Sequence, residues 1–171
     1  SSLIGGLTNV CVINSGGGAA GFGVQYTLPD GSTIGRHDMH HAASDSDPYK
    51  AMIQEASRRH VELIADMAQQ LAATPEIGSD ENMLDNTVFI YMSDNGEQHH
   101  STGAEWPTLL VGGRNMNLVT GGRTLVYPSV REAEHRQMSN LFNTLGHCAG
   151  VQLDRFGGEG DTRLHEGPLT A

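Results

Sequence analysis

The sequence predicts an α/β fold in which a layered, mostly parallel sheet is flanked by helices, within a single domain that covers residues 1–171. Two observations lead to this expectation. Strand-like apolar runs alternate with amphipathic segments in the order strand, loop, helix, strand, loop, strand, helix. The strongest strand-like run is apolar without interruption, which is typical of a strand covered on both faces.

The N-terminal part is expected to contain one strand and one long loop. Residues 8–14 (TNVCVIN) form an apolar, β-branched run, and Ser15 and three glycines follow it. This pattern predicts a buried strand that ends in a flexible loop. Residues 19–47 have no helical period and are rich in Gly, Asp, Ser and His. We therefore expect a long functional loop there.

The clearest helix is predicted from Pro48 to about Thr74. Asp47 is a suitable N-cap, proline is favoured in a first turn, and Pro75 stops the helix. Positions spaced by three and four residues define one buried stripe, which consists of Ile53, Ala56, His60, Ile64, Met67, Ala68 and Leu71. His60 is expected to be a hydrogen-bonded core side chain or a support for a site, rather than a ligand.

Three further elements are predicted in the second half of the chain. Residues 87–92 (TVFIYM) and 108–111 (TLLV) are apolar runs that predict strands, and a turn-forming sequence follows each of them. Residues 131–148 predict an amphipathic helix. Its inner face is expected to consist of Met138, Leu141, Phe142 and Leu145.

The charge of the chain argues against nucleic-acid and membrane partners. With 20 acidic and 10 basic residues the net charge is −10, so the surface repels phosphate backbones and anionic bilayers. No apolar run reaches the roughly 18 residues of a membrane span. Residues 1–6 (SSLIGG) have no initiator methionine, basic segment or apolar leader. We expect the chain to be the C-terminal part of a longer protein.

The two cysteines leave two alternatives open. Cys11 and Cys148 are the only cysteines of the chain, and in an oxidising compartment they would form one disulfide. Alternatively, they are two separate buried thiols. Their wide separation does not fit the spacing of metal-binding cysteines.

Three groups of metal-ligating side chains fall at or soon after predicted strand ends. They are His37, Asp38, His40 and His41; Asp94 and Asn95; and His99 and His100. Ligands of open α/β sheets collect beyond the carboxyl ends of the strands. Imidazole suits zinc, whereas carboxylate and amide oxygens suit calcium, magnesium or manganese. A turn or a solvated surface explains each group better when it is taken alone. Their coincidence at strand ends predicts a metal site.

The segment Leu84–Gly96 (LDNTVFIYMSDNG) resembles the "DNT, hydrophobic strand, SD(N/H)G" segment of sulfatases and their relatives in the alkaline phosphatase superfamily. His100 and residues 106–113 (WPTLLVGG) are similar to that superfamily's segment of a histidine, a proline and a buried strand. Nearly the whole chain resembles an uncharacterised family of exported bacterial proteins, domain of unknown function fifteen-fifty-two. Residues 71–76 (LAATPE) and 120–123 (TGGR) also fit that family. The resemblance implies an alkaline-phosphatase-like fold, incomplete in this chain, and a periplasmic or extracellular location.

The resemblance also implies a ligand set for one or two divalent metal ions. The ligands would be Asp38, His41, Asp94, Asn95 and His100. Asp38 and His41 are one residue closer together than the corresponding pair of the superfamily, so His37 or His40 is an alternative ligand. His99 would support the site or contact the substrate. The metal stays open among Zn, Mn, Ca and Mg, because asparagine favours a harder ion than histidine does.

The function that the resemblance implies is hydrolysis of a phosphate or sulfate ester, with Arg36 as a contact for the anionic substrate. The chain has no Cys-x-Pro-x-Arg sequence and no Ser or Thr in a recognisable nucleophile setting. The superfamily places its nucleophile in an N-terminal segment. The expected partners are therefore an anionic ester and the missing N-terminal part of the same protein. The alternative is a non-catalytic exported binding or structural protein that retains the fold.

Overall fold

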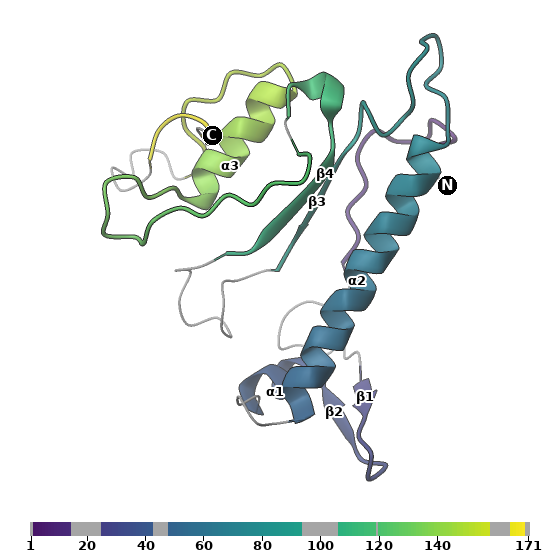
Figure 1. Cartoon of the computed structure of the whole chain (residues 1–171), viewed down its shortest axis with the longest axis vertical. Coiled ribbons are helices and arrows are strands. Elements are labelled where there is room, and N and C mark those ends of the chain that lie inside the picture. Colours follow the sequence, from purple (N-terminus) through teal and green to yellow (C-terminus); the bar gives the residue numbers. More distant parts are fainter. Residues whose placement is uncertain are drawn as a thin grey trace. The chain divides into compact units, whose positions relative to one another are not determined.

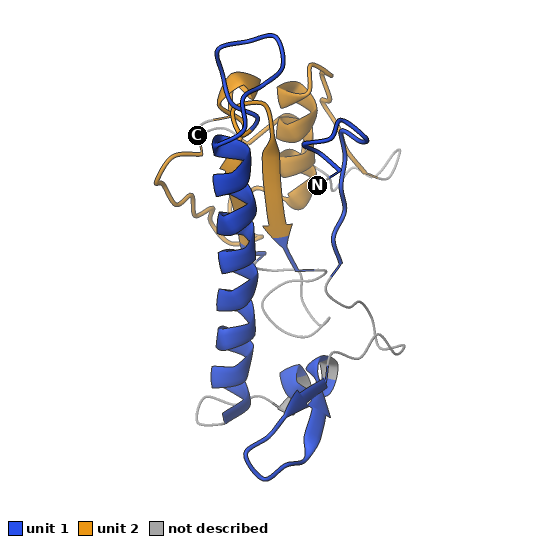
Figure 2. Ribbon diagram, turned by 90° about the vertical axis from the view of Figure 1, so that its right-hand side faces the viewer, with its two compact units in different colours: residues 1–83, 92–107 blue, residues 84–91, 108–171 orange. Residues whose placement is uncertain are grey.

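The computed structural model divides the chain into two compact units, which are coloured separately in Figure 2. Unit 1 comprises Ser1–Met83 and Met92–Pro107, and unit 2 comprises Leu84–Tyr91 and Thr108–Ala171. The residues that the structure describes are 2–14, 25–42, 48–93, 106–118, 120–157 and 165–169. Figure 1 labels their helices and strands.

Unit 1 contains a short hairpin. Strand β1 (Gln25–Thr27) pairs antiparallel with strand β2 (Thr33–Gly35). The turn between them is stabilised by Ser32, whose backbone N–H and hydroxyl donate to Asp30 Oδ1 at 2.9 and 2.6 Å. An aspartate that binds the backbone two residues later is a common turn-forming device.

Helix α1 (Arg36–Ala42) follows β2 directly. The prediction of a long loop over residues 19–47 is therefore wrong for residues 25–42. The reason is that α1 is anchored by one apolar side chain, Met39, which is fully buried. A single anchor in seven residues gives no apolar period that a sequence pattern can detect.

Helix α2 (Pro48–Ala72) is the long helix that the sequence predicts. Three residues of the predicted stripe are buried: Ala56, Ala68 and Leu71. A loop follows α2, and its two ends are joined by a hydrogen bond from the Met83 N–H to the Thr74 carbonyl at 2.9 Å.

Strands β3 (Val88–Met92) and β4 (Thr108–Gly112) lie where the sequence predicts strands, and they pair with each other. Ile90 at the centre of β3 is 40% exposed, so β3 is not covered on both faces as expected. After β4 the chain turns through Gly113, with a positive φ of 75°, into the 3-10 helix η1 (Arg114–Met116).

Helix α3 (Met138–Cys148) begins later than the predicted residue 131. A reciprocal cap fixes its start, because the Gln137 backbone N–H donates to Asn140 Oδ1 at 2.9 Å while the Gln137 side chain accepts from the Asn140 backbone. Leu141 of the predicted inner face is buried, and Phe142 stacks on Phe156 with a centroid distance of 4.6 Å.

The predicted fold class, a layered and mostly parallel α/β sheet, is wrong. The described residues contain two small sheets, each made of two antiparallel strands. Residues 8–14 lie in no strand, and Val10, Val12 and Ile13 are 76%, 87% and 71% exposed. Parallel neighbours need a crossover of about a dozen or more residues, whereas only residues 28–32 join the antiparallel strands β1 and β2.

Two predictions for the whole chain concern membranes and cysteines. No helix among the described residues is both long and apolar enough to cross a lipid bilayer, in agreement with the predicted absence of a membrane span. Cys11 and Cys148 are both free. Cys11 is exposed and Cys148 is partly buried, so the two-buried-thiols alternative fails for Cys11. Burial raises the pKa of the Cys148 thiol.

Candidate functional site

Helix α1 carries the first group of predicted ligands. Asp38 and His40 are exposed, on either side of the buried Met39. The Asp38 carboxylate lies over Gly35, where an added Cβ would come within 3.3 Å of its Oδ2 atom. Positions 38 and 41 are separated by three residues, a spacing that makes two helix positions neighbours. The side chains of His37 and His41 lie outside the described residues.

The second and third groups of predicted ligands lie outside the described residues: Asp94, Asn95, His99 and His100. The structure does describe the two residues that flank them. Strand β3 ends at Met92 and Ser93 follows, and the description resumes at Trp106 just before β4. Trp106 Nε1–H donates to the Ser93 carbonyl at 3.0 Å. The two described residues that flank 94–105 are therefore hydrogen-bonded to each other.

Asp85 and Asn86 belong to the predicted segment Leu84–Gly96 and precede strand β3. Their contacts hold the other end of the β3–β4 pair. Asp85 is 8% exposed and its Oδ2 atom accepts from Arg114 Nη2 at 2.8 Å. The Asp85 carbonyl accepts from the Asn115 backbone N–H at 2.9 Å, and Asn115 Nδ2 donates to Asn86 Oδ1 at 3.0 Å. These contacts tie the residues before β3 to those after β4. Their role in this chain is structural.

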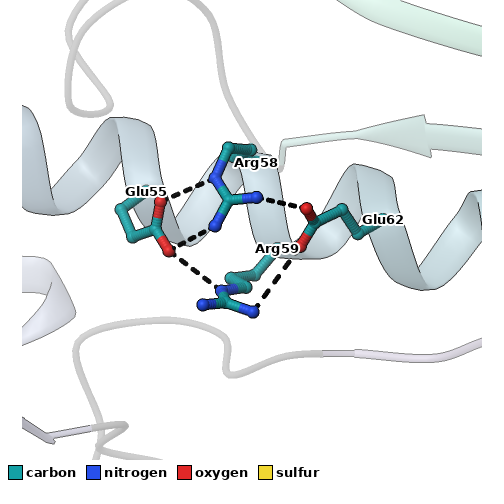
Figure 3. A network of polar contacts seen from close by, with 4 residues as sticks. All are labelled: Glu55, Arg58, Arg59 and Glu62. Atoms are coloured by element: carbon teal, nitrogen blue, oxygen red, sulfur yellow. Dashed lines mark hydrogen bonds and ion pairs between the residues drawn. The ribbon is translucent and has the colours of Figure 1, made fainter.

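The arginines on the surface of α2 are paired with glutamates. Glu55 binds Arg58 and Arg59, and Glu62 binds both as well (Figure 3). Hydrogen bonds from Arg58 and then from Arg59 lower the pKa of Glu55 to about 2. A phosphate or sulfate group would have to compete with both carboxylates for these guanidinium groups. The network is therefore a poor anion site.

Arg36, the predicted contact for an anionic substrate, is the first residue of α1. Burial lowers the pKa of His60, and the positive charge of Arg36 lowers it further. His60 lines a hollow of about 460 Å³ in unit 1, together with Tyr26 and Arg59 among others. His60 is therefore neutral over a wider pH range than an exposed histidine.

His135 and His165 form a pair that is not among the predicted ligands. The rings of His135 and His165 lie 5.7 Å apart between centroids. No motif points to them, because 30 residues separate the two in sequence.

Within the described ranges, no three His, Cys, Asp or Glu side chains come together as a metal-binding group. Among the five predicted ligands, only Asp38 has a described side chain; those of His41, Asp94, Asn95 and His100 lie outside the description. The predicted metal site therefore stays a prediction. The structure describes Ser93 and Trp106, which flank the second and third groups of predicted ligands.

Comparisons with known proteins do not assign the chain to a family. No protein-family model matches it, and no curated protein and no solved structure does. The resemblance to the alkaline phosphatase superfamily therefore rests on the motifs alone.

Proposed function

We propose that this protein is an exported, metal-dependent hydrolase of phosphate or sulfate esters, related to the alkaline phosphatases and sulfatases. The observation that carries the proposal is the position of Asp94 and Asn95. They follow strand β3 after one residue, Ser93. Ligands placed on or beside a regular element are held more precisely than ligands in the middle of a loop.

The hydrogen bond between Trp106 and Ser93 supports the same proposal. The 12 residues 94–105 include four predicted donors, and their flanking residues are joined at 3.0 Å. Joining the ends of a segment lowers the conformational entropy that is lost when several of its side chains bind one ion. The chain is also strongly acidic, with a net charge of −10, which favours cation binding.

Each predicted site residue has a role in this proposal that follows from its side-chain chemistry. Asp94, Asn95 and His100 would bind a divalent metal ion together with Asp38 and His41, and Arg36 would contact the anionic ester. The bound ion (Zn, Mn, Ca or Mg) supplies Lewis-acid polarisation of the ester oxygens and activation of the attacking group. His37, His40 and His99 are alternative ligands or contacts in this scheme. We assign no nucleophile to this chain.

Hydrolysis of aryl esters tests this proposal. The full-length protein, supplied with each candidate metal in turn, is expected to hydrolyse 4-nitrophenyl phosphate or 4-nitrophenyl sulfate. Asp94→Ala is expected to lower kcat/KM by at least about 100-fold, because a direct ligand is lost. Asp80→Ala is the matched control, since it removes the same charge from an exposed residue of the turn after α2. Equal activity of the two variants would contradict the role of Asp94.

One observation favours the alternative, a non-catalytic exported binding or structural protein. Leu7, Val10, Val12 and Ile13 lie close together in sequence and are all more than 70% exposed, at 81%, 76%, 87% and 71%. Clustered exposed apolar side chains are typical of surfaces that bind another protein. Absence of ester hydrolysis with every candidate metal, in a folded full-length protein, would favour this alternative.

A further inference from the structure

The pair formed by His135 and His165 lies beside the start of α3. His135 precedes the helix by three residues, and His165 belongs to the described segment 165–169. The two rings are 5.7 Å apart between centroids and nearly perpendicular, at 82°. Both residues belong to unit 2.

Hydrogen bonds define the tautomer of both rings. His135 Nδ1 lies 2.9 Å from the Pro128 carbonyl, and His165 Nδ1 lies 3.1 Å from the carbonyl of His135. A carbonyl oxygen only accepts, so each Nδ1 carries the hydrogen and donates it. In both neutral rings the lone pair is therefore on Nε2. None of the hydrogen bonds among the described residues involves either Nε2 atom.

These two Nδ1 hydrogen bonds are of the kind that metal-binding histidines make. A histidine ligand almost always donates its other ring N–H to a carbonyl or carboxylate, which fixes the orientation of the ring and strengthens the ligand nitrogen. A zinc–nitrogen bond is about 2.0–2.1 Å long. Two imidazoles on one ion therefore have ring centroids roughly 4.5–5.7 Å apart for nitrogen–metal–nitrogen angles of about 90–125°. The observed separation of 5.7 Å lies at the wide end of this range.

The backbone around the pair is held firmly in place. The His165 N–H donates to Gln137 Oε1 at 2.9 Å, and Asn140 Nδ2 donates to the carbonyls of Glu166 and Gly167 at 3.1 and 2.8 Å. Arg136 Nη1 donates to the His135 carbonyl at 2.8 Å. Two ligands that are already positioned lose little entropy on binding an ion.

We propose that His135 and His165 chelate a divalent transition-metal ion, such as Zn²⁺, Ni²⁺ or Cu²⁺, through their Nε2 atoms. The remaining coordination positions are open to water. The ion links the segment 165–169 to the residues that precede α3, and so works as a metal clasp. This site shares no residue with the proposed hydrolase site, and it does not depend on that function.

Thermal unfolding with Zn²⁺ or Ni²⁺ as the probe tests the clasp. Excess metal is expected to raise the melting temperature of the wild-type chain, because the ion binds only when both histidines are in place. His135→Gln and His165→Gln are each expected to remove the part of the shift that this site contributes, because each lowers the metal affinity of the site at least about tenfold. His147→Gln is the matched control, since its Nε2 atom already contacts the Leu153 carbonyl at 3.2 Å.

Two further measurements make the test decisive. Asp94→Ala is expected to keep the part of the shift that depends on His135 and His165, which separates this site from the proposed hydrolase site. If either glutamine variant does not fold, the ring nitrogen signals of the wild type are followed by NMR instead. Nε2 of His135 and Nε2 of His165 are then expected to respond with one common Kd. A wild type without a metal-induced shift, or different Kd values for the two rings, would overturn the proposal.

Discussion

Replacing Gly112 with alanine is expected to lower the free energy of unfolding by about 4 kcal/mol. Gly112 ends β4 with a φ of +87°, and an added Cβ would lie 2.2 Å from the Thr87 carbonyl oxygen and 2.9 Å from the Leu84 carbonyl oxygen. Both are backbone atoms, which cannot rotate away as a side chain does. The substitution therefore combines backbone strain with a clash that forces β3 and β4 apart. Urea unfolding followed by far-UV circular dichroism measures the effect.

Two other glycines separate strain from clash. Gly31 has a φ of +84° with nothing within 4 Å of an added Cβ, so Gly31→Ala is expected to cost about 1 kcal/mol. Gly121 has open space and no positive φ, so Gly121→Ala is expected to change stability by less than about 0.5 kcal/mol. If Gly112→Ala is the only one of the three variants without a cooperative unfolding transition, that outcome also agrees with the prediction. Equal midpoints for Gly112→Ala and Gly121→Ala would contradict the described pairing of β3 with β4.

Replacing Asn140 with alanine is expected to cost about 3 kcal/mol. Asn140 is fully buried, and its Nδ2 atom donates to the carbonyls of Glu166 and Gly167 at 3.1 and 2.8 Å. Its Oδ1 atom accepts the Gln137 N–H at 2.9 Å, which caps α3. Alanine leaves these buried backbone groups without partners and also leaves a cavity. The measurement is the change in unfolding free energy from urea titration.

Gln152→Ala provides the control for the loss of an amide. Gln152 is exposed, and its truncation is expected to change stability by less than about 0.5 kcal/mol. Asn140→Asp keeps the size of the side chain but replaces the donor with an acceptor. It is expected to be at least as destabilising as Asn140→Ala, because it places a carboxylate against carbonyl oxygens. A stable Asn140→Asp variant would show that Asn140 does not hold the segment 165–169.

Long periodic elements were predictable from the sequence. The 25 residues of α2 repeat the apolar stripe over several turns, so the pattern outweighs chance, and β3 and β4 are nearly pure apolar runs. The start of α3 was mispredicted because residues 131–137 can continue the helical pattern. The structure starts the helix at Met138, where the side chains of Gln137 and Asn140 form the cap. This pair is a weaker sequence signal for a helix start than serine or aspartate at the N-cap.

The fold class was not predictable, because an apolar run indicates a strand but does not name its partner. Residues 8–14 have the composition of a central strand, yet the described chain offers them no neighbouring strand. Strand direction depends on which segments meet in space, and that is a tertiary property. The order of strands and helices alone therefore led to a parallel sheet that the structure does not contain.

The candidate sites show the same division between local and distant information. The ligand groups around Asp38 and Asp94 are local clusters and were found by residue type and spacing. The pair of His135 and His165 could not be found in this way, since its two members are 30 residues apart and meet only through the fold. Helix α1 was overlooked because it has a single buried anchor, Met39.

The most direct test of the proposed function is the metal content of the full-length protein, purified without chelators and measured by mass spectrometry. The proposal predicts at least about one Zn, Mn, Ca or Mg ion per chain that is lost in Asp94→Ala. The metal that depends on Asp94 must persist in the His135→Gln/His165→Gln double variant, because the clasp is a separate site. A folded wild-type protein that contains no metal, or one whose metal content Asp94→Ala leaves unchanged, would contradict the proposed hydrolase site.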